Sequence, residues 1–127
     1  MGERFFTKKH LWVLQNGNTA TIGITDFLQE KLGVIIFLNL PEKGEKLLIG
    51  ERFGDIESKK TVMDLEAPIA GEVIEVNETL VNEPDAINDR PFESWFIKVK
   101  IGIMPNDMMT EIDYEERIRQ LRAQYHL

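Results

Sequence analysis

The sequence predicts a mainly β domain that carries a short helix in its first third and a longer helix at its end. Short segments rich in apolar and β-branched residues are separated by glycine, proline and asparagine, which is typical of strands and turns. Helical spacing of apolar residues is clearest at the C-terminal end. With 127 residues and 43% hydrophobic content, the chain has the size and apolar content of one domain, so we expect residues 1–127 to form a single domain.

A β hairpin is expected near the N terminus. Residues 11–15 and 19–24 are short segments rich in apolar and β-branched residues. Between them, the Asn-Gly-Asn at residues 16–18 tolerates the positive φ angles of a tight turn. The two segments are therefore expected to pair as antiparallel strands.

A short helix is expected directly after the hairpin. The side chain of Thr25 can accept a hydrogen bond from the first turn of a helix over residues 26–32. Asp26 lies in that first turn, near the positive end of the helix dipole, and the helix can end at Gly33. The apolar side chains of this helix can then dock on a sheet.

The middle of the chain predicts a buried strand and two related turns. Residues 34–40 form a nearly continuous apolar run before Pro41, and their length and β-branching favour a buried strand. We expect Ile36 to be buried within it. Residues 41–45 and 68–72 share the pattern Pro-x-x-Gly-Glu, so each is expected to turn the chain into a following strand. Two such turns suggest two related half-sheets, with chance as the competing explanation.

The C-terminal part predicts polar turns, a last strand and an amphipathic helix. Residues 78–91 are polar and rich in turn-forming residues, and residues 95–101 alternate as a final strand. An apolar stripe follows at helical spacing, and it consists of Tyr114, Ile118, Leu121 and Tyr125. Acidic residues lie early in this helix and arginines later, as the helix dipole favours. We expect the stripe to pack on the β core, with a partner surface as the alternative.

Composition argues against several classes of function. The 15 Lys and Arg against 22 Asp and Glu give 15 − 22 = −7, a charge that repels phosphate backbones, so nucleic acid is not an expected partner. With Cys 0 there are no disulfides and no thiolate metal sites, which fits a reducing compartment, and we expect a cytoplasmic location. No stretch approaches the roughly 18 apolar residues of a membrane span and the start lacks a signal-peptide pattern, so we expect a soluble protein without a membrane partner.

Ordinary catalysis and metal binding are not expected. Serine occurs only at Ser58 and Ser94 and histidine only at His10 and His126, so a nucleophile, a base and an orienting acid would have to meet by coincidence. The histidines lie at opposite ends of a chain without cysteine, which leaves no clustered zinc ligands. No glycine-rich loop has the strand-to-helix setting of a nucleotide site.

Two adjacent lysines interrupt the β-forming stretch GDIESKKTVMDLEAPIAGEV at residues 54–73. Lys59 and Lys60 are expected at the exposed tip of a hairpin. One explanation is that their charges only keep the tip solvated. The other is covalent modification, because a lysine on an exposed, rigid tip can enter a ligase and its deprotonated amine can attack an acyl-adenylate. The residues alone leave both explanations open.

Five blocks of the sequence resemble the H protein of the glycine cleavage system. They are FFTKKHLWV, TATIGITDFLQEKLG, PEKGEKLLIGERFGDIESKK, APIAGEVIEVNETL and INDRPFESWFIKVKI, in the family's order and spacing. The resemblance implies a lipoyl-carrier-type β-barrel or sandwich hybrid with short helices and a C-terminal α-helix. It also implies a non-catalytic protein that carries a cofactor for a multienzyme system.

The resemblance also implies where the cofactor is attached. In the family, lipoic acid forms an amide with the lysine of a Glu-Ser-x-Lys motif, which implies attachment at Lys60, with Glu57 and Ser58 before it and Lys59 at the variable position. A biotin carrier would have Met-Lys-Met, whereas Met63 lies three residues beyond Lys60, so biotin is not favoured.

The partners follow from the same resemblance. A pyridoxal-phosphate glycine decarboxylase loads the lipoyl arm with an aminomethyl group, a tetrahydrofolate aminomethyltransferase removes it, and dihydrolipoamide dehydrogenase reoxidises the arm. A lipoate ligase or lipoyl synthase is implied for making the arm. The carrier itself is expected to be a monomer that shelters the aminomethyl group in a surface cleft.

The chain departs from the family where that sheltering takes place. The family's His-Glu-Trp-Val reads His-Leu-Trp-Val at residues 10–13, so Leu11 replaces a glutamate that can hold the cationic aminomethyl nitrogen. Lys9 adds a cation that would repel this group unless it points to water. Asp64 keeps the position of a family acid, and it either compensates in part or is a solvated strand residue. Residues 61–63 are bulkier than the small residues usual after the lipoyl lysine.

These departures keep a second function open. Some H-like proteins carry lipoate for sulfur metabolism or lipoate relay, and this chain could serve such a pathway. A third possibility, an unmodified binding module, requires that Lys60 is never acylated. Glycine cleavage is the first expectation.

Overall fold

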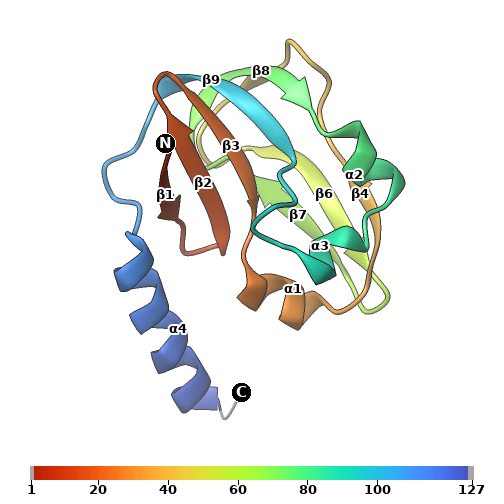
Figure 1. Cartoon of the computed structure of the whole chain (residues 1–127), viewed down its shortest axis with the longest axis vertical. Coiled ribbons are helices and arrows are strands. Elements are labelled where there is room, and N and C mark those ends of the chain that lie inside the picture. Colours follow the sequence, from red (N-terminus) through yellow and green to blue (C-terminus); the bar gives the residue numbers. More distant parts are fainter. Residues whose placement is uncertain (1, 126–127) are drawn as a thin grey trace.

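The computed structural model describes residues 2–125, with only the backbone of Tyr125, and consists of two antiparallel sheets with helices around them (Figure 1). The six-stranded sheet has, in spatial order, β1 (Glu3–Phe6), β2 (Leu11–Asn16), β3 (Thr19–Ile24), β9 (Ile97–Ile103), β8 (Ala70–Val76) and β5 (Lys46–Leu47). The three-stranded sheet has β4 (Ile35–Asn39), β6 (Arg52–Ser58) and β7 (Val62–Glu66) in that order. The helices are α1 (Asp26–Leu32), α2 (Glu78–Asn82), α3 (Ala86–Asp89) and α4 (Glu111–Tyr125).

Both sheets contribute to the main hydrophobic cluster. Ile22 of β3 and Ile97 of β9 come from the larger sheet, and Ile56 of β6 and Leu65 of β7 come from the smaller one, and all four are 0% exposed. Each strand alternates between the core and the outer face, since successive side chains point to opposite sides of a sheet. The predicted mainly β fold with short helices and a C-terminal helix is confirmed.

The local predictions for the first third of the chain are confirmed. β2 and β3 pair as a hairpin, and Gly17 in its turn has a φ of 67°. The side-chain oxygen of Thr25 accepts the backbone N–H of Leu28 at 3.3 Å and so caps α1. Gly33 ends the helix with a φ of 80°, in the region that favours glycine.

The strand predicted within residues 34–40 is present as β4, but the prediction that it is buried on both faces is wrong. β4 lies at the edge of the three-stranded sheet and has one covered face, so Ile35 and Leu38 are buried whereas Ile36 is only half-buried. Phe37 is 59% exposed. An apolar run is buried on both sides only where another layer covers the second face, and the outer face of this sheet has none at Phe37.

Both predicted Pro-x-x-Gly-Glu segments lead the chain into a strand, but only the first is a turn closed at its glycine, and the second is a bend at Pro68 and Ile69 before β8. Gly44 has a φ of 95°, and the backbone N–H of Glu45 donates to the carbonyl of Glu42 at 3.1 Å. Gly71 instead lies inside β8, at a register shift opposite β9. A Cβ at Gly71 would collide with the carbonyl oxygen of Lys100, so glycine is required there for the close approach of a strand.

The C-terminal part differs from its prediction in three details. The polar stretch 78–91 contains the short helices α2 and α3, and the last strand begins two residues later than expected, at Ile97. α4 packs through Tyr114 on a smaller cluster with Phe6 and Trp12, at one side of the large sheet (Figure 1). Ile118 packs against this cluster and Leu121 is half-buried, whereas the side chain of Tyr125 lies outside the described residues, as does His126.

Candidate functional site at the β6–β7 hairpin

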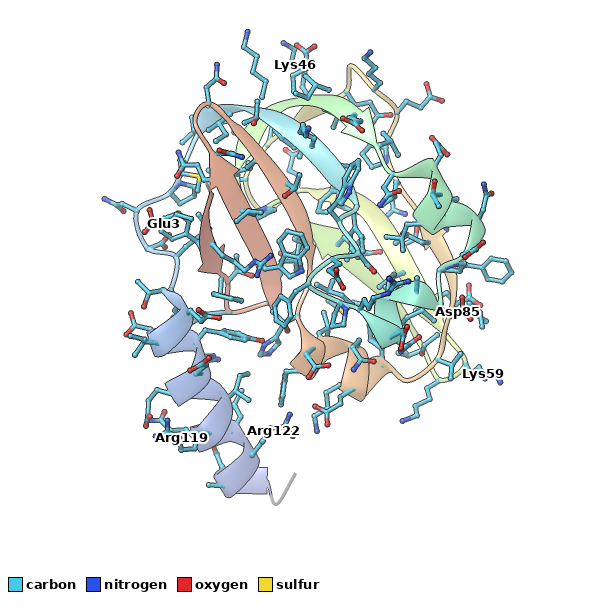
Figure 2. The ribbon with its side chains drawn as sticks, viewed as in Figure 1. Glu3, Lys46, Lys59, Asp85, Arg119 and Arg122 are labelled. Carbon is cyan, nitrogen blue, oxygen red and sulfur yellow. The ribbon has the colours of Figure 1, made fainter. Side chains whose placement is uncertain are left out.

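The lysine pair forms the tip of the hairpin between β6 and β7. β6 ends at Ser58 and β7 begins at Val62, so Lys59 and Lys60 lie in the turn, and both are exposed. Lys59 extends away from the body of the molecule in Figure 2. The structure therefore confirms a two-stranded hairpin with two accessible amines at its end.

Ser58 holds the turn from inside. Its side chain is buried, and its hydroxyl oxygen accepts the backbone N–H groups of Lys60 at 3.1 Å and Thr61 at 3.2 Å. Its backbone N–H donates to the carbonyl of Thr61 at 2.8 Å. A short polar side chain that bonds the backbone two and three residues ahead is a common way to fix a turn. The conformation of the tip is thus determined by the serine of the Glu-Ser-x-Lys motif.

The tip also rests on the segment that follows α1. The backbone N–H of Lys59 donates to the carbonyl of Val34 at 3.1 Å. The methylene chain of Lys60 lies over Gly33, since a Cβ added to this glycine would be 3.4 Å from Cε of Lys60. The residue that ends α1 therefore lies against the outer part of the Lys60 side chain.

The two acidic residues differ in their distance from the tip along the chain, since Glu57 precedes Ser58 at the end of β6 and Asp64 lies further along β7. Glu57 is half-buried and pairs in register with Phe37 on one side and Val62 on the other. The carboxylate of Asp64 accepts the Nε–H of Arg52 at 3.1 Å, and its side chain is 64% exposed. Asp64 lies two residues beyond Val62, the first residue of β7, which is about 7 Å along the strand.

A cleft of about 340 Å³ opens between the start of β2 and β7, and it is lined by Lys9, Leu11, Met63, Asp64 and Glu66. Leu11 is 1% exposed and forms an apolar wall that belongs to the main core. Nζ of Lys9 lies 3.7 Å from a carboxylate oxygen of Glu66, so its charge has an anionic partner at the rim.

Sequence reasoning missed Glu66 and Arg52 as members of this region. Glu66 follows Asp64 at a spacing of two on β7, which places both carboxylates on the same face of the strand. That alternation was readable from the sequence. The ion pairs of Asp64 with Arg52 and of Glu66 with Lys9 were not, since they join segments distant in the chain.

The geometry suits a covalently attached cofactor. An exposed lysine lies on a turn fixed by hydrogen bonds, and a partly apolar cleft with two carboxylates is lined by residues of the strand that follows it. Within residues 2–124, no group of three or more potential ligands is arranged to hold a metal ion. No helix in the described part of the chain is long and apolar enough to cross a membrane.

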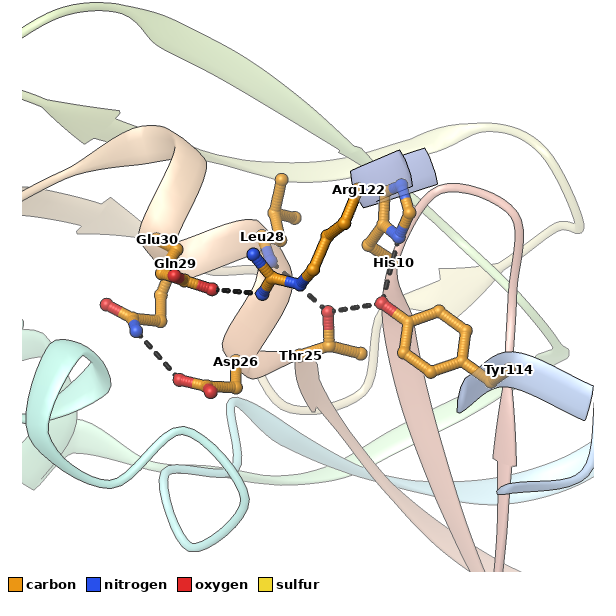
Figure 3. A network of polar contacts seen from close by, with 8 residues as sticks. All are labelled: His10, Thr25, Asp26, Leu28, Gln29, Glu30, Tyr114 and Arg122. Carbon is orange, nitrogen blue, oxygen red and sulfur yellow. Dashed lines mark hydrogen bonds and ion pairs between the residues drawn. The ribbon is translucent and has the colours of Figure 1, made fainter. Parts of the chain in front are cut away.

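His10 belongs to a structural network and not to this site (Figure 3). Its Nδ1 lies 2.8 Å from the hydroxyl of Tyr114, which lies 2.7 Å from Oγ1 of Thr25. Burial raises the pKa of Tyr114 to about 12. Burial, assisted by the charge of Arg117, lowers the pKa of His10. An ion pair between Arg122 and Glu30 also joins α4 to α1.

Fold and sequence comparisons define the class as a carrier with the H-protein fold. A crystal structure of a glycine cleavage system H protein from Mycobacterium marinum matches with a TM-score of 0.85 and 33% identity, over 94% of this chain and 98% of that one. The glycine cleavage H-protein family model matches residues 4–121. The chain belongs to the glycine cleavage H-protein family.

Two relatives illustrate the similarity within the family. The glycine cleavage system H protein of Lachnoclostridium phytofermentans is 40% identical over 116 residues, which cover 91% of each chain. The H protein of Chromohalobacter salexigens is 52% identical over 99 residues, or 76% of each chain. The resemblance seen in the sequence is therefore confirmed.

Proposed function

We propose that this chain carries lipoic acid as an amide on Nζ of Lys60 and shuttles the aminomethyl group of glycine between the enzymes of the glycine cleavage system. The observation that carries the proposal is the exposed Lys60 on a turn fixed by buried Ser58, in a chain of the H-protein family. Glycine cleavage relatives support this pathway. The alternative, a lipoyl carrier for sulfur metabolism or lipoate relay, gains no support from them.

Attachment requires only a free amine and an activated acyl group. In a ligase, the deprotonated Nζ of Lys60 attacks the acyl carbon of a lipoyl-adenylate, an amide forms, AMP leaves and one amine proton is released. The structure supports this step because Lys60 is exposed and its backbone is held by Ser58. This step assigns the attachment to a lipoate ligase, and a lipoyl synthase is the alternative proposed source of the cofactor.

When bound, the lipoyl group supplies the sulfur that carries the aminomethyl group. The chain contributes the cleft beside β7, whose residues would border the cargo of an arm on Lys60. Leu11 and Met63 exclude water from one side of this cleft, which slows hydrolysis of its cargo. Asp64 and Glu66 supply negative charge for a cationic amine, although each already binds a cation, Arg52 and Lys9 respectively.

The proposed partners are a pyridoxal-phosphate glycine decarboxylase, a tetrahydrofolate aminomethyltransferase and dihydrolipoamide dehydrogenase. In this proposal the partner enzymes make and break the bonds of the substrates and the carrier only presents the lipoyl group, so its role is non-catalytic. We further propose that residues 1–127 act as one monomeric domain in the cytoplasm.

Intact mass spectrometry tests the attachment site. Protein incubated with lipoate ligase, ATP and lipoate should gain one lipoyl group, and Lys60→Arg should abolish the gain. Lys59→Arg is the matched control, because it changes the neighbouring exposed lysine of the same turn and should leave the gain intact. The reverse pattern would move the site to Lys59, and no gain in wild type would refute the carrier function.

A further inference from the structure

Three exposed apolar residues lie on the segments that meet at the lysine hairpin. Val34 is 49% exposed, Phe37 59% and Val62 60%, and we call these three residues the apolar collar. They come from the segment after α1, from β4 and from β7, so the fold and not the local sequence brings them together. Large apolar side chains that gather on a charged surface mark interaction sites more often than isolated ones do.

The strand register puts two of the collar residues, Phe37 and Val62, on one outward face. Phe37 is opposite Glu57, and Glu57 is opposite Val62, so Phe37, Glu57 and Val62 form a row across β4, β6 and β7, with the carboxylate between the two apolar side chains. The row spans about 10 Å, since neighbouring strands lie roughly 4.8 Å apart. Val34 continues the collar toward the tip, where its carbonyl accepts the N–H of Lys59. The apolar surface and the lysine turn are therefore parts of one ordered unit.

The short length of an unmodified lysine side chain indicates which partner enzyme covers this surface. The enzymes of the pathway meet the far end of a long lipoyl arm and can dock at a distance from the turn. The enzyme that attaches the lipoyl group has to bring its active site to Nζ of Lys60, at the end of a four-carbon side chain. A specific interface covers about 800 Å² on each partner, which corresponds to a circular patch with a radius of about 16 Å. A patch of this size centred on Lys60 would include the row, which is only about 10 Å long.

We propose that the apolar collar is the docking surface for the enzyme that attaches the lipoyl group to Lys60. The proposal rests on the function proposed above. The partner surface is apolar opposite Phe37 and Val62, and it presents a cation or another hydrogen-bond donor to Glu57, because covering a carboxylate without a partner is unfavourable. Collar and turn together then present the amine in one orientation.

Steady-state lipoylation of the full chain tests the collar. Phe37→Ser and Val62→Ser should each raise the KM of a lipoate ligase for the carrier about fivefold or more, the effect of losing one interface residue worth over 1 kcal/mol, and should leave kcat unchanged. Ile103→Ser is the matched control, because Ile103 is 61% exposed but lies at the end of β9, away from the hairpin tip. Its KM should equal that of wild type.

Each other outcome has a defined meaning. An unchanged KM in both collar variants, with wild type modified at Lys60, overturns the docking proposal and leaves the carrier function intact. A fall in kcat alone would assign the collar to positioning the lysine and overturn docking. If Phe37→Ser instead dissociates a wild-type dimer in sedimentation without a change in KM, the collar is a self-association surface. Absence of modification at Lys60 in wild type removes both proposals.

Discussion

The hydroxyl oxygen of Ser58 accepts the backbone N–H of Lys60 at 3.1 Å, and the donor residue is the one we propose to carry the cofactor. The serine is buried and the lysine is exposed, so the contact joins the hydrophobic interior to the outermost point of the hairpin. An exposed turn is usually the most mobile part of a hairpin. Here the side chain before the lysines restricts that motion.

Ser58→Ala should loosen the turn more than it destabilises the domain. The change removes an acceptor of two backbone N–H groups, and because these donors lie at the surface and regain water, we expect a loss of about 1–2 kcal/mol in the free energy of unfolding. Lipoylation by a ligase should also slow. Urea unfolding and initial rates of modification measure the two effects. Thr61→Ala, a change at an exposed residue of the same turn, should stay within about 0.5 kcal/mol of wild type.

Leu11→Glu should improve retention of the aminomethyl cargo. An added carboxylate in the cleft can form a charge-assisted hydrogen bond with the cationic nitrogen, worth about 1.5–3 kcal/mol, which leucine cannot supply. We expect wild type to release formaldehyde and ammonia faster than the variant. The measurement loads the lipoylated protein with the decarboxylase and labelled glycine, and then follows the label over time.

Asp64→Asn serves as the comparison for that experiment, because Asp64 lines the same cleft. Equal retention in wild type and Leu11→Glu, with rapid loss only in Asp64→Asn, would assign the charge to Asp64 and refute the effect of Leu11. Since Leu11 is 1% exposed, unfolding of Leu11→Glu has to be checked in parallel.

Two isoleucines near the hairpin should differ in their contribution to stability. Ile56 on β6 is 0% exposed, and Ile56→Ala should cost about 2–5 kcal/mol through lost burial and the cavity left behind. Ile36 on β4 is only half-buried, so Ile36→Ala should cost about 1–2 kcal/mol. Urea unfolding of both variants gives the comparison, and equal losses would contradict the one-sided burial of β4.

Acidic pH should destabilise the wild-type protein through His10. Its folded-state pKa is lowered below the ordinary 6.5, so the unfolded state binds more protons as the pH falls. The contribution of neutral His10 is therefore complete above pH 6.5 and is lost as the pH falls from 6.5 through the lowered pKa. His10→Asn tolerates the φ of 65° at this position and does not titrate. Unfolding between pH 7 and 5 should show a smaller loss in this variant, and identical slopes would exclude His10.

The elements predicted well from the sequence are those with signals inside the element. The α1 helix carries its own caps in Thr25 and Gly33, and the β2–β3 turn carries Gly17. The pairing of β3 with β9, which are distant in the chain, has no such local signal. The burial of residues 34–40 was predicted wrongly for the same reason. Exposure depends on what covers the sheet and not on the hydrophobicity of the strand.

The candidate site was predictable as a motif but not as a surface. Lys59 and Lys60 lie at the expected tip, and the family motif pointed to Ser58 before its contacts were known. The motif did not indicate that Val34 and Gly33 support the turn, since both belong to a segment more than twenty residues earlier. Long-range contacts of this kind become visible only in three dimensions.

The bonds of the lysine turn also limit how its length can change in evolution. Surface turns generally tolerate insertions, because their backbone groups are free to find water. In this turn the N–H groups of Lys59, Lys60 and Thr61 all have fixed acceptors, in Val34 and Ser58. One inserted residue would break this set and shift the lysine relative to both α1 and the collar, so related chains are expected to vary in the identity of residue 59 far more than in the number of residues between Ser58 and Val62.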